Sequence, residues 1–117
     1  MAEITTQAYQ DIRDHIQNTW KFIELRDAQG TAVLRLSTDD SRVNWTHVQG
    51  ERELKLQINV KGTDSEITIP QSFGASAVFN VETGGSEFSA ESFTPFTIES
   101  DKDELTIVHA ILVPRTI

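Results

Sequence analysis

The sequence has no cysteine, only three prolines and no long apolar run. Without cysteine, the chain has no disulfide framework, no cysteine-ligated zinc site and no thiol nucleophile. No apolar segment approaches the roughly 20 residues that a transmembrane helix needs. Residues 1–4 also lack the basic start and apolar stretch of a signal peptide. We therefore expect the protein to stay in the compartment where it is made.

Basic residues are scarce, because 10 Lys and Arg face 18 Asp and Glu and the formal net charge is −8. Proteins that bind nucleic acid through its phosphates carry clustered basic residues, and anionic membrane surfaces attract the same clusters. No such cluster is present in this sequence. We therefore expect neither nucleic-acid binding nor membrane binding.

The 117 residues have the length of one domain (1–117) that can bury its own core. One segment, about residues 6–18, has a helical pattern. In it Ala8, Ile12 and Ile16 recur every four residues, with Tyr9 beside them, and a preceding threonine can cap the first turn. Its opposite face is mostly polar: Asp11, Arg13, Asp14 and Gln17.

After this helix the pattern changes to the period of two that is typical of β-strands. The clearest case is residues 54–61, where Leu54 and Ile58 alternate with Lys55 and Asn59. The expected strands are 20–27, 31–36, 43–48, 54–61, a short one with Ile67 and Ile69, 77–81, one with Phe96 and Ile98, and 105–113, while residues 86–92 are expected to form a loop. The sequence thus predicts a mainly β fold, a β-sandwich or barrel of about seven to eight antiparallel strands with one N-terminal α-helix.

The last predicted strand, 105–113, differs from the others because it is apolar on both faces. Leu105, Ile107, His109, Ile111 and Val113 share one face, and Val108, Ala110 and Leu112 share the other. A strand that is apolar on both faces needs cover on both sides. We expect the opposite sheet to cover one side, and the N-terminal helix or a second subunit to cover Val108, Ala110 and Leu112.

No constellation in the sequence carries recognisable chemistry. His15, His47 and His109 lie on different predicted elements without the close spacing of metal ligands, so we expect no metal site. The acidic turn at 101–104 lacks the spacing of a calcium loop. A serine nucleophile elbow and a glycine-rich phosphate loop are both missing. We therefore expect a protein that is not an enzyme and that needs no cofactor.

The tryptophans offer one alternative, because carbohydrate-binding modules are often β-sandwiches with exposed aromatic faces. Trp20 adjoins the helix end, and we expect it in the core, where aromatic rings bury a large area. Trp45 stands in a strand among polar neighbours. Its sequence context leaves open whether it packs in the core or binds a glycan.

Three stretches resemble small proteins from the structural gene modules of tailed bacteriophages and prophages: residues 4–12 (ITTQAYQDI), 20–27 (WKFIELRD) and 103–109 (DELTIVH), the last closing at Val113-Pro114. The resemblance runs over most of the chain and rests on general texture. It implies a virion component, in the head decoration, the head–tail connection or the tail, made in the cytoplasm of a host bacterium. It implies no catalytic residue.

Such proteins act by symmetric self-association and by docking to other virion proteins. An apolar interface would serve both purposes. The sequence-based interface residues are Val108, Ala110 and Leu112 on the last strand and Tyr9 on the helix, which could act as a docking arm. Replacing Leu112 with a charged residue should then disturb packing or assembly.

Overall fold

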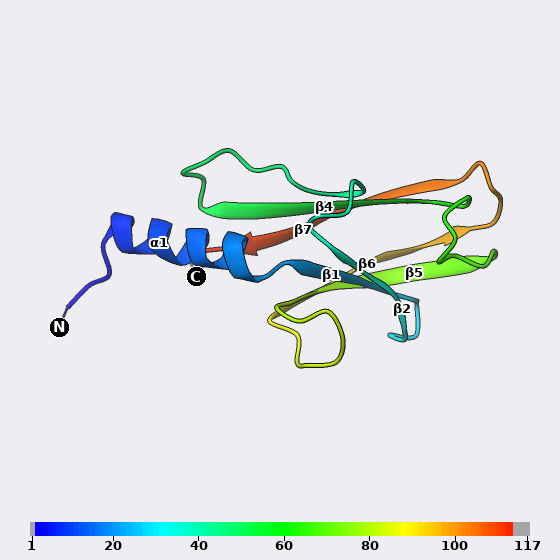
Figure 1. Cartoon of the computed structure of the whole chain (residues 1–117), viewed down its shortest axis with the longest axis horizontal. Helices are drawn as coiled ribbons and strands as arrows, with labels where there is room; N and C mark the ends of the chain where they lie inside the picture. Colours follow the sequence, from blue (N-terminus) through cyan, green and yellow to red (C-terminus); the bar gives the residue numbers. More distant parts are fainter. Residues whose placement is uncertain (1, 114–117) are drawn as a thin grey trace.

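The computed structural model describes residues 2–113 and shows one helix followed by seven strands in two antiparallel sheets (Figure 1). The elements are α1 (Thr6–Thr19), β1 (Phe22–Arg26), β2 (Ala32–Ser37), β3 (Val43–Trp45), β4 (Glu53–Lys61), β5 (Gln71–Phe79), β6 (Ser89–Ile98) and β7 (Glu104–Leu112). Sheet A has the strand order β2-β1-β5-β6, and sheet B has the order β3-β4-β7. The predicted mainly β fold with an N-terminal helix is confirmed, and the two separate sheets make it a sandwich.

The core lies between the inner faces of the two sheets. On β4, Leu54, Leu56, Ile58 and Val60 are at most 1% exposed, as the alternation predicts. Ile23 and Leu25 of β1 face them from sheet A and are fully buried. Burying one such side chain contributes roughly 1.5–3 kcal/mol. This layer of aliphatic side chains therefore holds the sheets together.

Helix α1 begins at the predicted cap, where the Thr5 hydroxyl accepts a hydrogen bond from the Ala8 amide. Figure 1 shows that α1 projects from one end of the sandwich, so only its last turns can pack against the sheets. The predicted stripe is therefore partly wrong. Ile16 is buried, but Ile12 is 39% exposed and Arg13 is only 3% exposed.

Three expectations about strands are also wrong, the first being the strand at 77–81, since β5 begins at Gln71 and ends at Phe79. Residues 67–69 form no strand, because the chain crosses here from sheet B to sheet A, and Ile67 is buried in the crossover with its amide bonded to the Asp64 carbonyl. The expected loop at 86–92 is too long, because β6 already begins at Ser89. The polar residues that open β6 give no apolar alternation that would mark a strand.

Candidate functional site

The outer face of sheet A is partly filled by its own side chains, beside an open hollow of about 280 Å³ that Glu24, Arg35 and Gly84 help to line. Glu24 on β1 is 6% exposed and accepts hydrogen bonds from Arg35 Nε (3.2 Å) and Nη2 (2.9 Å). The Arg35 guanidinium lies 3.5 Å from the centroid of the Phe79 ring. Its Nη1 also donates to the carbonyls of Val81 and Gly84. The loop between β5 and β6 is thus fastened over this face, and a partner would have to displace it.

Among the residues that the structure describes, none covers the outer face of sheet B in this way. Its outward side chains on β4 and β7 include Lys55, Gln57, Asn59, Thr106, Val108, Ala110 and Leu112, which we call the open face. Val108 is 44% exposed and Leu112 is 38% exposed, although both are large and apolar. The expectation that α1 covers these residues is wrong, because α1 extends beyond the end of the sheets (Figure 1).

Within residues 2–113, no strand pairs with the second edge of β7, which we call its free edge. The Val113 amide donates to the Arg52 carbonyl, and the Gly62 amide donates to the Asp103 carbonyl. Odd-numbered residues of β7 therefore face β4, and the even-numbered residues from 104 to 112 point their N–H and C=O groups away from it, since the ladder has no register shift. One of these groups is capped, because the Ala110 amide donates to the carboxylate of Glu91 on β6 (3.2 Å).

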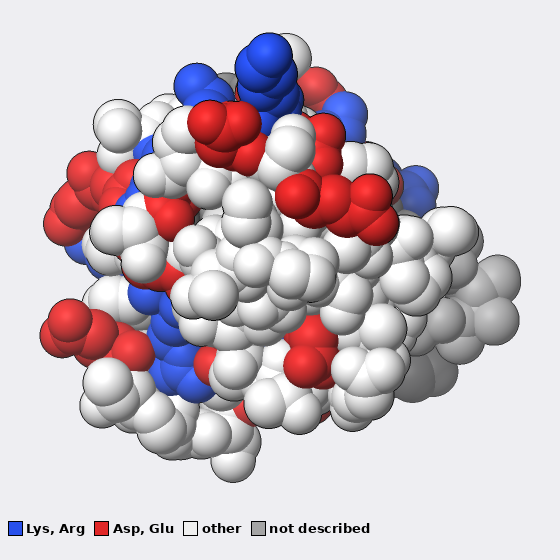
Figure 2. All heavy atoms as spheres, turned by 90° about the vertical axis from the view of Figure 1, so that its right-hand side faces the viewer, with Lys and Arg blue, Asp and Glu red and all other residues white. Residues whose placement is uncertain are grey.

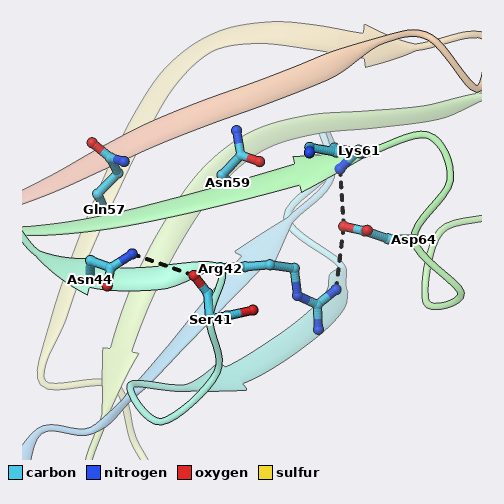
Figure 3. Close-up of a pocket in the computed structure, with 7 residues that line it drawn as sticks. All are labelled: Ser41, Arg42, Asn44, Gln57, Asn59, Lys61 and Asp64. Carbon is cyan, nitrogen blue, oxygen red and sulfur yellow. Dashed lines mark hydrogen bonds and ion pairs between the residues drawn. The ribbon is translucent and has the colours of Figure 1, made fainter.

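A polar hollow of about 260 Å³ lies beside the apolar part of the open face (Figure 3). It is lined by Ser41, Arg42, Asn44, Gln57, Asn59, Lys61 and Asp64. Asn59 is engaged, because its amide donates to Glu104 (2.7 Å) and to Thr106 (2.8 Å). The Gln57 side chain has no hydrogen-bond partner among the residues described, so its amide can form hydrogen bonds with a ligand.

Two cationic side chains line this hollow, Arg42 and Lys61, and the neighbours of Arg42 neutralise it. Arg42 forms ion pairs with Asp40 (2.8 Å), Asp64 (3.3 Å) and Glu66 (2.8 Å). The hydrogen bond from Arg42 lowers the pKa of Asp40 to about 2. The carboxylates in turn raise the pKa of Arg42. Since its donors are occupied, Arg42 does not make the hollow a site for anions.

His109 forms the most concentrated group of polar atoms in the core. Its Nδ1 lies 2.7 Å from Oγ of Ser76, and its Nε2 lies 2.8 Å from Oγ of Ser89. Glu91 approaches Nδ1 only to 4.0 Å. Hydroxyl, imidazole and carboxylate are the groups of a catalytic triad. However, His109 is fully buried, and the group close to its Nδ1 is a serine hydroxyl and not a carboxylate. This arrangement is therefore typical of a structural link between the two sheets.

The structure keeps the other predicted residues apart. His15 is exposed on α1, whereas His47 Nε2 lies 3.2 Å from the Gln17 side chain. No group of three or more His, Asp or Glu side chains within residues 2–113 is placed to hold a metal ion. Tyr9 is half-buried on α1.

The two tryptophans pack against the core from its margins. Trp45 is half-buried, pairs in register with the inward Leu56, and meets the ring of His47 edge to face at 5.6 Å. Its neighbour Asn44 lines the hollow instead. Trp20 is also half-buried and contacts Phe88 edge to face. Trp20 was expected in the core and lies at its margin, and the sequence left the position of Trp45 open.

Some residues of the site were missed. Glu91 was assigned to a loop, and its role depends on the nearness of β6 and β7, which the sequence does not encode locally. The hollow had a signal, because Gln57 and Asn59 are the polar half of the strongest alternation in the chain.

Comparison with protein-family models gives no match, and comparisons with curated proteins and with solved structures give none either. Residues 2–113 contain no helix with the length and apolarity of a membrane span.

Proposed function

We propose that this chain is a non-enzymatic structural protein of a bacteriophage virion, and that it acts by docking to copies of itself and to other virion proteins. The observation that carries the proposal is the open face of sheet B. There Val108 and Leu112 remain exposed beside a free strand edge. Neighbouring exposed apolar side chains mark interaction sites more often than isolated ones do.

The chemistry of the open face supports docking over catalysis. The hollow is lined by amides, by Lys61 and by Arg42 with its ion pairs, and the imidazole of His109 with its two serine hydroxyls lies inside the core. Tyr9 and the exposed Ile12 add a second contact on α1, which projects far enough to reach a neighbour. The proposed place of action is the virion, after synthesis in the host cytoplasm.

The carbohydrate-binding alternative has one observation in its favour, the amide-lined hollow with a free Gln57. Neutral sugars are bound by such amides, but usually together with an aromatic platform. Trp45 lies on the core side of β3 and does not offer its face to the hollow. A glycan array with the wild-type chain and with Gln57→Ala would test this alternative, and the absence of any glycan signal would remove it.

The first test of the main proposal is the molar mass by light scattering on a sizing column at micromolar concentration. We expect a defined oligomer, and we expect Leu112→Asp to shift it toward the monomer. Val48→Asp is the matched control, because Val48 is an exposed valine (67%) outside the open face. A second test is mass spectrometry of purified phage particles from a host that carries the gene. Particles that lack this chain would contradict the proposal.

A further inference from the structure

We infer that β7 pairs in antiparallel orientation with β7 of a second copy, about a two-fold axis that passes beside Val108. The inference rests on the proposed function only in naming the partner of the same open face. It joins the two copies of sheet B into one continuous sheet of six strands, since each contributes three. A two-fold contact of this kind is the commonest symmetry among protein oligomers.

The first argument is that β7 lacks the protection that the other edge strands have. Natural sheets protect their edges with short strands, bulges, prolines and charges. Strand β3 has only three residues, β2 pairs with β1 through an irregular register at Leu25/Arg26, and β6 contains Pro95 opposite a register shift at Phe73/Ala75. Strand β7 has nine residues, no register shift and no proline.

The second argument is the chemistry that β7 presents. Its even-numbered residues point their backbone groups to the free edge and their side chains to the open face. From Thr106 to Leu112 these side chains are uncharged, and Val108 at the centre is 44% exposed. The Ala110 amide at this edge donates a hydrogen bond to the Glu91 carboxylate, which caps the edge. The Glu91 side chain itself is 45% exposed. A side chain so exposed can swing aside when a strand arrives.

The third argument fixes the register. Full overlap of Glu104–Leu112 with its copy sets Val108 opposite Val108 of the second copy. Thr106 then faces Ala110 of the second copy, and Glu104 faces Leu112 of the second copy. Any other register shortens the overlap, and a shift toward Glu104 brings the two glutamates together. Like charges directly opposite each other destabilise a strand pair.

Charge also favours contact along this side of the molecule. The formal net charge of −8 opposes association in general. Figure 2 shows acidic and basic side chains intermixed around an uncharged centre at the end opposite α1, so end-to-end contact brings many charged groups together. Along β7 only Glu104 is charged. We therefore expect association to strengthen as salt rises from 20 mM to 300 mM, because salt screens the remaining repulsion.

Cysteine cross-linking tests both the partner and the register, because the chain has no cysteine of its own. Hydrogen-bonded antiparallel pairs have Cα atoms about 5.5 Å apart, which lies within the range of a disulfide. Under mild oxidation Val108→Cys should give a dimer on a non-reducing gel that reductant removes. Thr106→Cys alone should give little, because four residues of offset separate its copies by about 13 Å. A mixture of Thr106→Cys and Ala110→Cys should cross-link.

The control is Val48→Cys, at an exposed valine outside β7. Cross-linking of Val48→Cys to the same extent as Val108→Cys would overturn the inference, and so would cross-linking of Thr106→Cys without Val108→Cys. Val108→Pro adds an independent test, because it removes a free-edge N–H that β4 does not use. We expect a folded monomer by circular dichroism and light scattering. An oligomer that survives Val108→Pro would refute the β7 contact while leaving the proposed function standing.

A wild-type chain that stays monomeric up to hundreds of micromolar, and whose Val108→Cys variant gives no dimer, would overturn the inference. The proposed function is tested separately by the presence of the chain in purified particles. The two proposals can therefore fail independently.

Discussion

The imidazole of His109 on sheet B lies 2.8 Å from the hydroxyl of Ser89 on sheet A. The opposite ring nitrogen lies 2.7 Å from Ser76, so one side chain of β7 bridges two strands of the other sheet. In the neutral ring one nitrogen donates and the other accepts, which the two hydroxyls can match. The sandwich is thus joined near β6 and β7 by polar bonds as well as by aliphatic packing.

Replacing this imidazole should destabilise the sandwich. His109→Ala leaves the Ser76 hydroxyl buried without a partner, and we expect a loss of about 2–4 kcal/mol in the free energy of unfolding. The urea midpoint by circular dichroism measures it. The double variant His109→Leu/Ser76→Ala should lose less stability than the sum of the losses of His109→Leu and Ser76→Ala measured singly. In the double variant both partners are apolar, so neither is left as an unpaired polar group. Additive losses would show that the bridge is not an energetic unit.

The same histidine should make stability depend on pH. Burial lowers the pKa of His109 below the ordinary value of 6.5, and the attraction of Glu91 does not compensate. Just below pH 6.5, His109 therefore binds a proton in the unfolded chain but stays neutral in the folded chain. The stabilisation is complete above about pH 6.5 and falls as the pH drops below it, by at most about 1.4 kcal/mol per pH unit. Urea midpoints at pH 7.5 and 5.5 should differ less in His109→Gln, whereas His15→Gln should behave like the wild type.

Arg35→Ala should open the outer face of sheet A. It removes the stacking on Phe79 and one of the two arginines that neutralise the buried Glu24. We expect a loss of about 1–3 kcal/mol, moderated because Arg26 remains paired with Glu24. Amide hydrogen exchange should also speed up in the loop from Val81 to Gly84. Lys102→Ala, at an exposed turn, is the control, and an unchanged loop would contradict the role of Arg35.

Arg13→Ala should loosen α1 from the sandwich. Arg13 is buried and donates to the Val113 carbonyl just beyond β7, while Gln10 holds its guanidinium in place. Losing this anchor should cost about 1–3 kcal/mol and increase amide exchange in α1. Asp11→Ala, on an exposed position of the same helix, should have little effect. An Arg13→Ala variant that loses no more stability than Asp11→Ala would contradict the anchor, because alanine itself favours the helix at both positions.

Glu91→Ala should strengthen self-association. It frees the Ala110 amide at the edge of β7, so a second strand no longer has to displace a carboxylate. We expect a dissociation constant about tenfold lower, measured by analytical ultracentrifugation. Glu99→Ala removes one negative charge elsewhere and controls for net repulsion. If the two variants strengthen association equally, charge alone explains the gain.

Much of the fold was predictable because it follows local periodicity. The alternation from Leu54 to Val60 encodes a half-buried strand without reference to any other residue. The start of β6 had no such signal, since Ser89 and Ser92 gain their strand geometry from pairing with Val78 and Ala75. Arg13 was placed on the polar face because arginine is rarely buried, and only the end of β7 provides the carbonyl that permits it.

Local sequence patterns also indicated part of the candidate site, but not the contacts between its elements. Two-faced apolarity singled out Val108 and Leu112, and both are exposed on the outer face of sheet B. The sequence could not tell which sheet surface α1 covers. That depends on the angle between α1 and β1, which follows it. The cap by Glu91 and the bridge by His109 join residues from different sheets, so they exist only in the folded chain.

The direction in which α1 leaves the sandwich has a consequence for any two-fold pairing through β7. The chain measures 54 Å along its longest axis, and α1 lies at the end where β7 finishes. An antiparallel pair reverses that axis, so the two helices would point outward in opposite directions. Such a pair would be elongated, with an identical helix at each end. It could bind two copies of one partner site and hold them at a fixed separation.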